Sequence, residues 1–428
     1  MTGSTTVAIS GGGPAGVLLG LLLARQGVEV TVLEKHADFL RDFRGDTVHP
    51  STQLILQDLG LLEEFQGIVH GRMASLDFGT TDGPLVHAEL ADVQPRHPFH
   101  EIALAPQWDL LDLLVRHARR YPSFTLLMEA ETTDGLAAAG AVRGVRYRRH
   151  GLEHELRAVL TVDAEGRGSG LRAAIGSDLV ELGAAIDVLW FRLPHHDGDA
   201  AGLRGQLGRG GALVAIDRQD YWQLAFIVAK GSADAVRAAG LETFRVTIGR
   251  LAPWLADRTG ELTDWDQVKL LAVTVERLRR WWAPGILAIG DAAHTMSPVG
   301  GVGINLAVAD AVAAANLLGP RLLEAQQDPA RFRRVLNPAL LAQVQRRRMP
   351  TAVVTQRVQV LAQDRILAMT RTPEGESLLP PALVRMLLQG VGARVAPRVF
   401  VYGLRPERVN APGAGSRSEA PMGAAPAA

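Results

Sequence analysis

Gly11-Gly12-Gly13-Pro14-Ala15-Gly16 is the stretch that decides the fold of this chain. It follows residues 5–9, a β-branched apolar run that is typical of a buried central strand. Residues 17–26, rich in leucine and alanine, predict a helix, and residues 28–33 predict a second strand that ends at Glu34. A strand, a glycine turn, a helix and a strand with a terminal acid, in this order, match the G-x-G-x-x-G pattern of dinucleotide-binding folds.

Each glycine of this pattern has a physical role. Gly11 allows a tight turn, Gly13 lets the main chain approach a pyrophosphate, and Gly16 lets the helix lie close to the strand. The helix begins near Pro14 and Ala15, where unpaired N–H groups and the helix dipole attract phosphates. The pattern therefore predicts a nucleotide site, and the alternative is a tight packing turn without a ligand.

Glu34 indicates which nucleotide binds. Its carboxylate can accept hydrogen bonds from an adenosine ribose and repels a ribose phosphate, so the site suits FAD or NAD rather than NADP. Lys35, the next residue along the chain, is a further candidate for cofactor contact.

The composition limits the class of protein. With 428 residues, of which 47% are hydrophobic, the chain exceeds one comfortable core and is expected to form two or three structural units. Its 45 basic and 45 acidic residues balance, which argues against nucleic acid or an anionic membrane as the main partner. The absence of cysteine excludes disulfides and thiolate chemistry and fits a reducing compartment such as the cytoplasm. No run reaches about 18 apolar residues, so we expect no membrane span. We also expect the protein to be a monomer or a homodimer.

Residues 183–283 differ in pattern from the rest of the chain. Strands are predicted at 188–193, 212–217, 221–228 and 268–275, with one helix at 241–251, so this part forms an α+β unit on an antiparallel sheet. An Asp-Gly turn predicts a hairpin within residues 75–98, and this stretch is assigned to the same unit. We therefore expect one domain from residues 1–74, 99–182 and 284–340, a second from 75–98 and 183–283, a helical segment at 341–408 and a disordered tail at 409–428.

Three separated segments together resemble one family. GGGPAG with Glu34, DAEGRGSGLR at residues 163–172 and GDAAHTMSPVGGVGINLAVADA at residues 290–311 are similar to motifs of FAD-dependent monooxygenases of the p-hydroxybenzoate hydroxylase type. The resemblance covers about residues 5–318. It implies an α/β fold: a three-layer, Rossmann-like FAD-binding domain on a mostly parallel sheet, an inserted α+β substrate domain on an antiparallel sheet, and a C-terminal helical segment.

The resemblance also implies the chemistry. NADPH or NADH is expected to visit the flavin briefly as electron donor, since no second G-x-G-x-x-G unit follows a strand. Reduced flavin then reacts with dioxygen to give a flavin hydroperoxide, which hydroxylates an electron-rich small molecule, commonly aromatic or polyketide-like. The protein orients the substrate and excludes water. The motifs are specific for fold and cofactor but not for substrate.

Cofactor-binding residues follow from the same resemblance. Asp291 ends a parallel strand and matches the aspartate that holds the ribityl chain of FAD. Arg44 matches an arginine near the pyrophosphate or flavin, and Gln107 matches a cofactor-contacting glutamine, although a glutamine at a helix start can also simply cap it. Glu165 replaces the family's aspartate and is one methylene longer. The glycine-rich loop and helix start near the flavin ring contribute Pro298, Gly301, Val302, Gly303, Ile304 and Asn305.

Substrate contacts are predicted on the antiparallel sheet. Trp190 and Arg192 share one face of a strand, and Tyr221 and Gln223 share one face of another. For each of these residues the alternative is a structural role.

Two residues are candidates for the flavin face. His49 follows the Arg44 loop and could approach the ring, and Pro298 lies at that face in the family. Neither is assigned as a catalytic base. His195-His196-Asp197 has no further ligands at suitable spacing, so no metal site is predicted.

We predict an FAD-dependent NAD(P)H monooxygenase and keep two alternatives. The first is another FAD enzyme on the same scaffold, such as a reductase, a dehydrogenase or a halogenase, although the W-x-W-x-I-P motif of flavin halogenases is absent from the sequence. The second is a non-catalytic protein that sequesters a flavin or an aromatic ligand.

Overall fold

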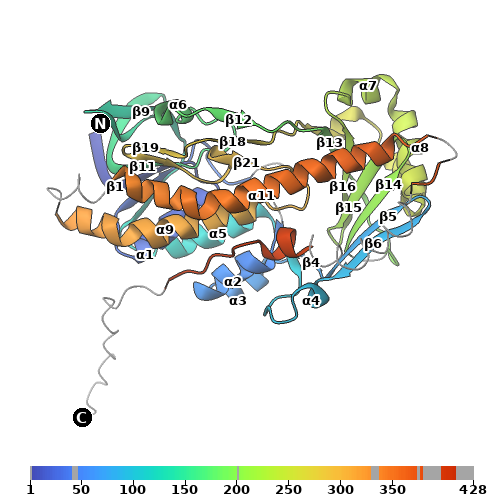
Figure 1. The fold of residues 1–428 in the computed structure, drawn as a ribbon, viewed down its shortest axis with the longest axis horizontal. Helices are drawn as coiled ribbons and strands as arrows, with labels where there is room; N and C mark the ends of the chain where they lie inside the picture. The colour runs from blue at the N-terminus through green and yellow to red at the C-terminus, as the bar shows by residue number, and fades with distance from the viewer. Residues whose placement is uncertain are drawn as a thin grey trace, which may run out of the picture.

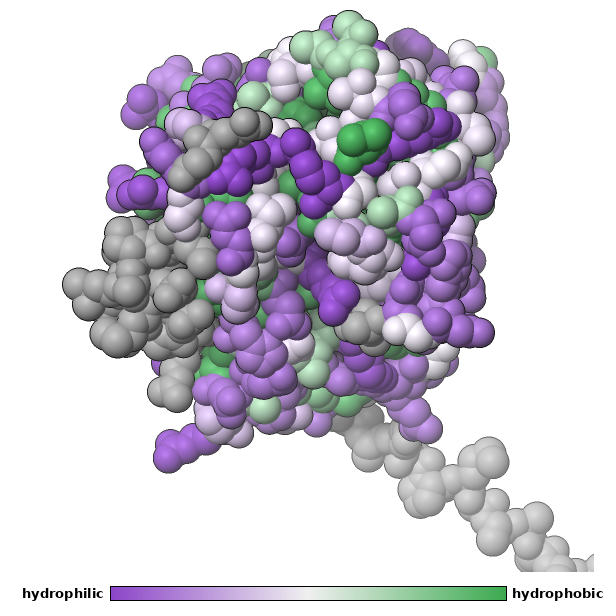
Figure 2. Space-filling view, turned by 90° about the vertical axis from the view of Figure 1, so that its right-hand side faces the viewer, coloured by the Kyte–Doolittle hydropathy of each residue, from purple (hydrophilic) through white to green (hydrophobic). Residues whose placement is uncertain are grey.

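The computed structural model describes residues 2–40, 47–199, 202–328, 337–373, 376–378 and 397–410. Two large sheets form two halves that lie side by side along the longest axis of the molecule (Figure 1). The helix α11 (Pro338–Thr370), drawn in orange, runs across both halves. The described surface at the end formed by the second half is largely hydrophilic, with hydrophobic residues in small separate areas (Figure 2).

The first sheet contains the strands around the glycine turn. Its order is β19-β20-β11-β1-β2-β8, and β10 and β9 extend it from β11. β1 pairs in parallel with β2 and β11, β2 with β8, and β11 with β20, so the predicted mostly parallel sheet is confirmed. The strands are β1 (Thr2–Ser10), β2 (Val30–Leu33), β8 (Phe124–Leu127), β9 (Ala130–Ala138), β10 (Ala141–Arg149), β11 (Leu152–Asp163), β19 (Trp282–Ala283) and β20 (Ile286–Ala288).

Helix α1 (Pro14–Arg25) is the centre of the first half. Proline stands at its first turn, where a missing N–H costs nothing, and residues 15–24 are all buried. The helix packs against α5 (Gln107–Ala118) and α9 (Gly303–Gln327). The leucine-rich run after the glycine turn is therefore core.

The second sheet has the order β17-β13-β16-β15-β14-β5-β6. All its pairs are antiparallel except β14 with β5, so the predicted antiparallel sheet is confirmed. The strands are β5 (Ser75–Thr80), β6 (Gly83–Glu89), β13 (Ile186–Pro194), β14 (Leu203–Gly208), β15 (Gly211–Asp217), β16 (Tyr221–Ala229) and β17 (Lys269–Leu271).

Alternation along the strands gives this sheet two different faces. On β13, Leu189, Phe191 and Leu193 point to one side and pack with helix α8 (Leu241–Leu251) and the 3-10 segment η1 (Pro253–Glu261) in a closed core. Ile186 and Val188 point to the other side, toward the first half of the molecule.

Smaller elements connect the two halves. There are also two three-stranded sheets, with the orders β3-β7-β4 and β12-β18-β21. The remaining elements are β3 (Thr47–Val48), α2 (Pro50–Asp58), α3 (Leu62–Gln66), β4 (Gly71–Met73), α4 (Leu90–Val93), β7 (Ile102–Leu104), α6 (Arg172–Ile175), β12 (Leu179–Glu181), α7 (Ala233–Ala238), η2 (Trp265–Gln267), β18 (Glu276–Leu278), η3 (Gly290–Ala292), β21 (His294–Thr295) and the π-helical η5 (Arg398–Tyr402).

Several predicted elements differ in extent. The strand predicted at 268–275 is only β17, because the N–H of Val273 donates to the Asp187 carboxylate at 3.0 Å instead of to a neighbouring strand. Strands β9 and β14 were not predicted. The domain boundaries stay a prediction, and the tail beyond residue 410 lies outside the described residues.

Among the described helices, α9 has the length and apolar composition to cross a membrane. Its most apolar window is 72% buried within the fold, where the helix packs against α1 and α11. Its apolar composition therefore fits a core helix.

Candidate functional site

A cavity of about 940 Å³ joins the two halves of the molecule. One part of its wall comes from the glycine turn and the loops at the carboxyl ends of the parallel strands, and another part from the inner face of the second sheet. Sequence segments that are hundreds of residues apart thus line one space. Predicted cofactor residues on the wall are Gly11, Gly13, Pro14, Ala15, Glu34, Lys35, Gln107, Glu165, Asp291, Pro298, Gly301, Val302, Gly303 and Ile304.

The glycine turn has the geometry that its sequence predicts. Gly11 has φ +108°, and a Cβ there would lie 2.3 Å from the Ala164 carbonyl oxygen. A Cβ on Gly16 would lie 2.0 Å from the Gly11 carbonyl oxygen, so this glycine serves close packing and does not line the cavity. A Cβ on Gly13 would meet no protein atom within 4 Å, because this residue faces the open cavity. Among Gly11, Gly13 and Gly16, Gly13 alone has open space where a Cβ would be, so a ligand can lie directly against its main chain.

Glu34 lies beside this turn and is 7% exposed. Its carboxylate accepts hydrogen bonds from the N–H groups of Gly12 at 2.9 Å and His36 at 3.0 Å. These bonds fix the acid at the end of β2, on the cavity wall.

The segment after β11 holds two acids against one hydroxyl. The Ser169 hydroxyl oxygen lies 2.8 Å from an Asp163 carboxyl oxygen and 2.9 Å from a Glu165 carboxyl oxygen. A hydroxyl has one proton, so it can donate to only one of the two acids, and the other must be protonated to complete the second bond. Burial and the neighbouring Glu165 raise the pKa of Asp163 to about 7, so Asp163 takes up a proton more readily than an ordinary aspartate does.

Asp291 follows β20 in the short turn η3, as the strand order predicts. Its carboxylate lines the cavity and has no hydrogen-bond partner among the residues that the structure describes. Burial raises its pKa, against the opposing charges of His294 and Arg167. An acceptor left open toward a cavity is suited to a ligand hydroxyl.

A buried ion cluster fixes this turn from behind. Asp310 on α9 accepts hydrogen bonds from the Gly290 N–H at 3.1 Å, His294 Nε2 at 2.6 Å and Arg348 Nε at 2.9 Å. Burial alone would raise the pKa of Asp310, but His294 and Arg348 outweigh it, so the pKa is lowered. The cluster was not predicted from the sequence.

Asn305, a predicted cofactor residue, has another role. Its side-chain oxygen accepts from the His49 N–H at 3.0 Å and the Thr52 hydroxyl at 2.7 Å, and its amide nitrogen donates to the Thr47 and Gly301 carbonyls. It joins the loop before α9 to the segment before α2 and does not line the 940 Å³ cavity.

His49 lines the cavity and is 1% exposed. Its Nδ1 lies 2.9 Å from the Phe400 carbonyl oxygen, which can only accept, so Nδ1 carries the proton and Nε2 is left as an acceptor. Nε2 is buried without a hydrogen-bond partner among the described residues. Burial lowers the pKa of His49 to about 4, so the ring is neutral near pH 7.

The inner face of the second sheet gives the other part of the wall. It is almost entirely apolar, and of the described residues that this sheet contributes, Arg218 alone is charged. The Arg218 Nε and Nη2 atoms donate to the buried Gln223 side-chain oxygen at 2.8 and 2.6 Å. The apolar wall residues of the sheet are Leu76, Phe78, Val86, Ala88, Ile186, Val188, Trp190, Leu203, Val214, Ile216, Ala225, Ile227 and Leu271.

Two of the four predicted substrate residues reach this wall. Trp190 and Gln223 line the cavity, and the Trp190 indole N–H is buried without a partner among the described residues. Arg192 and Tyr221 lie on the same sheet face but beyond the cavity, where the guanidinium stacks 4.4 Å from the tyrosine ring centre. Arg192 and Tyr221 therefore do not line this cavity, because the strands run past its edge, and their contact with a substrate stays a prediction. Arg44 lies outside the described residues.

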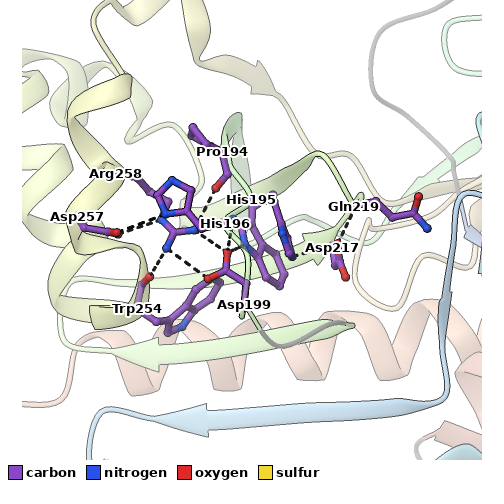
Figure 3. Close-up of polar contacts among 10 residues, drawn as sticks. Pro194, His195, His196, Asp199, Asp217, Gln219, Trp254, Asp257 and Arg258 are labelled. Carbon is purple, nitrogen blue, oxygen red and sulfur yellow. Dashed lines mark hydrogen bonds and ion pairs between the residues drawn. The ribbon is translucent and has the colours of Figure 1, made fainter.

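Arg218 was missed, although extending the alternation of Val214 and Ile216 by one step leads to it. It stands in the turn after β15. In this turn the Asp217 carboxylate accepts a hydrogen bond from the Gln219 N–H at 2.7 Å, and the same carboxylate lies 3.6 Å from His195 Nε2 (Figure 3).

A polar cluster behind this turn holds the neighbouring loop. Arg258 donates to Asp199 at 2.6 Å, and the Trp222 indole donates to the same carboxylate at 2.7 Å. Figure 3 shows Arg258 between Asp199 and Asp257, with His195 and His196 on the adjoining loop. Within the described part of the chain no group of three or more His, Cys, Asp or Glu side chains is placed to hold a metal ion.

The residues of the cavity fit FAD. Gly13 leaves open space beside a helix start, the Asp291 carboxylate is an unused acceptor, and an apolar chamber adjoins the glycine-rich loop. An extended dinucleotide with a flat ring needs all three features in one continuous space.

The comparisons agree with this geometry. Residues 4–329 match the family described as the FAD binding domain. The chain is 31% identical over 411 residues to 6-methylpretetramide 4-monooxygenase of Streptomyces rimosus, which covers 95% of this chain and 94% of that protein. This chain belongs to the family of FAD-dependent monooxygenases. It is an oxidoreductase with FAD as cofactor.

Two further relatives extend the comparison. The chain is 27% identical to 12-dehydrotetracycline 5-monooxygenase/anhydrotetracycline 6-monooxygenase of Streptomyces rimosus, over 72% of this chain and 61% of that protein. The P. aeruginosa PqsL structure in complex with 2-aminobenzoylacetate has the same fold, with a TM-score of 0.71 at 23% identity, over 86% of this chain and 100% of that chain.

Proposed function

We propose that this flavin monooxygenase acts as a single component and uses NAD(P)H and dioxygen to hydroxylate an electron-rich, multi-ring aromatic or polyketide-like small molecule. The observation that carries the proposal is the continuous cavity, in which the cofactor motifs and the apolar inner face of the second sheet line one space. The names of the tetracycline-type relatives support a multi-ring substrate.

The cofactor residues have separate roles in this proposal. Glu34 and Lys35 hold the adenosine end, Gly13 and the start of α1 hold the pyrophosphate, and Asp291 holds the ribityl chain. Gln107 and Glu165 contact the cofactor from the side of the cavity. The loop residues before α9 and its first turn hold the flavin ring, and they are Pro298, Gly301, Val302, Gly303 and Ile304.

When bound, FAD accepts a hydride from the nicotinamide and activates dioxygen so that one oxygen atom passes to the substrate. The chain's contribution is to position the substrate and to exclude water. The inner face of the second sheet contributes to both, because apart from Trp190, Arg218 and Gln223 the described residues that it brings to the cavity are apolar. We propose that Trp190 and Gln223 contact the substrate.

His49 orients the substrate in this proposal. Its Nε2 is an acceptor at neutral pH, because Nδ1–H is held by the Phe400 carbonyl and the pKa is lowered to about 4. A phenol or enol hydroxyl on the substrate would donate to this atom. His49 does not need to be charged for that role.

NADPH or NADH is proposed to visit the flavin transiently, and the enzyme to work in the cytoplasm as a monomer or homodimer. The absence of cysteine supports the reducing compartment.

The test uses the purified protein loaded with FAD. NAD(P)H consumption is measured in air with a panel of phenols, hydroxyanthraquinones and tetracyclic polyketides, and the products are analysed by mass spectrometry for a gain of one oxygen atom. We expect stimulated consumption and an oxygenated product with at least one multi-ring compound. Turnover that continues without dioxygen would favour a reductase and contradict the proposal.

A further inference from the structure

A segment near the C-terminus forms part of the cavity wall. Residues 397–402, which we call the C-terminal wall, comprise Pro397 and the π-helical η5, drawn as a short red helix beside α2 in Figure 1. Pro397, Phe400 and Val401 line the cavity. The matched family region ends at residue 329, so this part of the wall lies outside it.

Phe400 contacts the cofactor half of the cavity through two different groups. Its ring lies against the glycine-rich loop, where a Cβ on Gly300 would be 2.9 Å from the Phe400 Cδ1. Its carbonyl oxygen accepts from His49 Nδ1 at 2.9 Å. One residue thus packs beside the flavin loop and also sets the tautomer of His49.

The next two residues contact the substrate half. Val401 and Tyr402 are buried in a cluster with Met73, Ile102 and Ile216, three residues that also line the cavity. The Tyr402 hydroxyl donates to the Leu90 carbonyl at 2.8 Å, and burial raises the tyrosine pKa to about 12, so this bond persists at neutral pH. The C-terminal wall therefore bridges both halves of the cavity.

Ion pairs hold this wall in place from outside the cavity. Glu407 is 2% exposed and accepts from Arg347 at 2.6 Å and Arg348 at 3.4 Å. Arg348 also donates to Asp310, the acid that accepts the Gly290 N–H. Arg348 therefore connects the C-terminal wall to the buried cluster that fixes the turn η3.

We propose that the C-terminal wall determines which substrates fit, and that Phe400 is its specificity-determining residue. The proposal rests on the proposed function and adds the part of the chain that sets substrate size. The Phe400 ring limits the space between the glycine-rich loop and the sheet face, so a smaller side chain admits a larger fused-ring system. A π-helix is a rare conformation that occurs mostly at functional sites, which fits its position on this wall.

The experiment compares two probes in the FAD-loaded enzyme, a three-ring dihydroxyanthraquinone and a four-ring dihydroxytetracenequinone. Kd is measured for each from the change in flavin absorbance. The variants are Phe400→Ala and the milder Phe400→Leu, which covers the case that the alanine variant fails to fold. Val399→Ala is the matched control, since Val399 is in the same segment but does not line this cavity.

We expect the ratio of the two Kd values, measured with each protein saturated with FAD, to shift toward the four-ring probe by about tenfold in Phe400→Ala and by less in Phe400→Leu. Val399→Ala should keep the wild-type ratio. An unchanged ratio in both Phe400 variants, equal changes for the two probes, or no binding of either probe to the wild type overturns the inference. Wild-type protein that shows the Kd pattern but forms no oxygenated product contradicts the proposed function and leaves the size role of Phe400 standing.

Discussion

The two halves of the cavity are built in different ways. The cofactor half is made largely of main chain: a glycine turn, a helix start and a glycine-rich loop, with a few acids at strand ends. The substrate half is made of side chains on one face of a sheet and of the C-terminal wall. A main-chain site depends on where glycines allow close approach, whereas a side-chain site depends on which residues alternate toward it. We therefore expect the cofactor half to tolerate few substitutions, whereas a single substitution can change the shape of the substrate half.

The largest effect is expected at Gly16. A methyl group there would lie 2.0 Å from the Gly11 carbonyl oxygen, so Gly16→Ala should abolish FAD binding and lower the free energy of unfolding by about 3 kcal/mol. Flavin absorbance and urea denaturation measure the two effects. Gly13→Ala is the matched control: it should leave the stability of the FAD-free protein unchanged and weaken FAD binding by about tenfold, because its methyl group fills only the cavity. Equal stability of the two variants would contradict this distinction.

The next effect tests the support of the cofactor half. Asp310→Asn removes the closer of the two acids that pair with the buried Arg348, leaving Glu407 at 3.4 Å, and should cost about 3 kcal/mol in unfolding free energy, with weaker FAD binding because the Gly290 turn is released. Glu324→Gln, which removes an exposed pair with Arg321, should cost less than about 1 kcal/mol. Thermal unfolding followed by circular dichroism separates them. A stable Asp310→Asn protein with normal FAD affinity would show that the cluster does not support the turn.

The two faces of the second sheet can be compared at neighbouring positions. Leu189→Ala opens a void in the closed core with α8 and should cost about 2–5 kcal/mol. Val188→Ala removes atoms from the cavity wall and should cost about 1 kcal/mol, while changing substrate Kd more than Leu189→Ala does. Chemical denaturation and ligand titration give both numbers. If both variants weaken substrate binding equally, the assignment of the inner face as substrate wall fails.

The last effect concerns the pH dependence of stability. The pKa of Asp163 is about 7 in the folded protein and ordinary in the unfolded chain, so between about pH 4 and pH 7 the folded state binds more protons and stability falls as pH rises. Asp163→Asn should remove up to about 1.4 kcal/mol per pH unit of this slope. Unfolding curves at several pH values measure it. Identical slopes in the two proteins would show that Asp163 is already ionised.

Much of the cofactor half was predictable, because its contacts leave a local record in the sequence. Gly11 and Gly13 stand where the main chain turns or opens to the cavity, and Asp291 stands where a parallel strand ends. Asn305 shows the limit of motif reasoning. It lies within the glycine-rich motif, yet its side chain serves the His49 segment.

The substrate half could be predicted only in outline. Alternation brings Trp190 and Gln223 to the wall, but it does not say where the cavity ends, so it also selects Arg192, which lies beyond the cavity. Phe400 contacts His49 across 351 positions of sequence, and no local sequence pattern predicts such a contact. The residues of the substrate half are brought together by packing between segments that are far apart in the sequence.

A crystal structure of the FAD complex tests the central claim most directly. The account predicts the adenosine beside Glu34, the pyrophosphate at Gly13, and the flavin ring between the glycine-rich loop and the inner face of the second sheet. FAD bound on another surface, or a flavin ring separated from that sheet face by side chains, would contradict it.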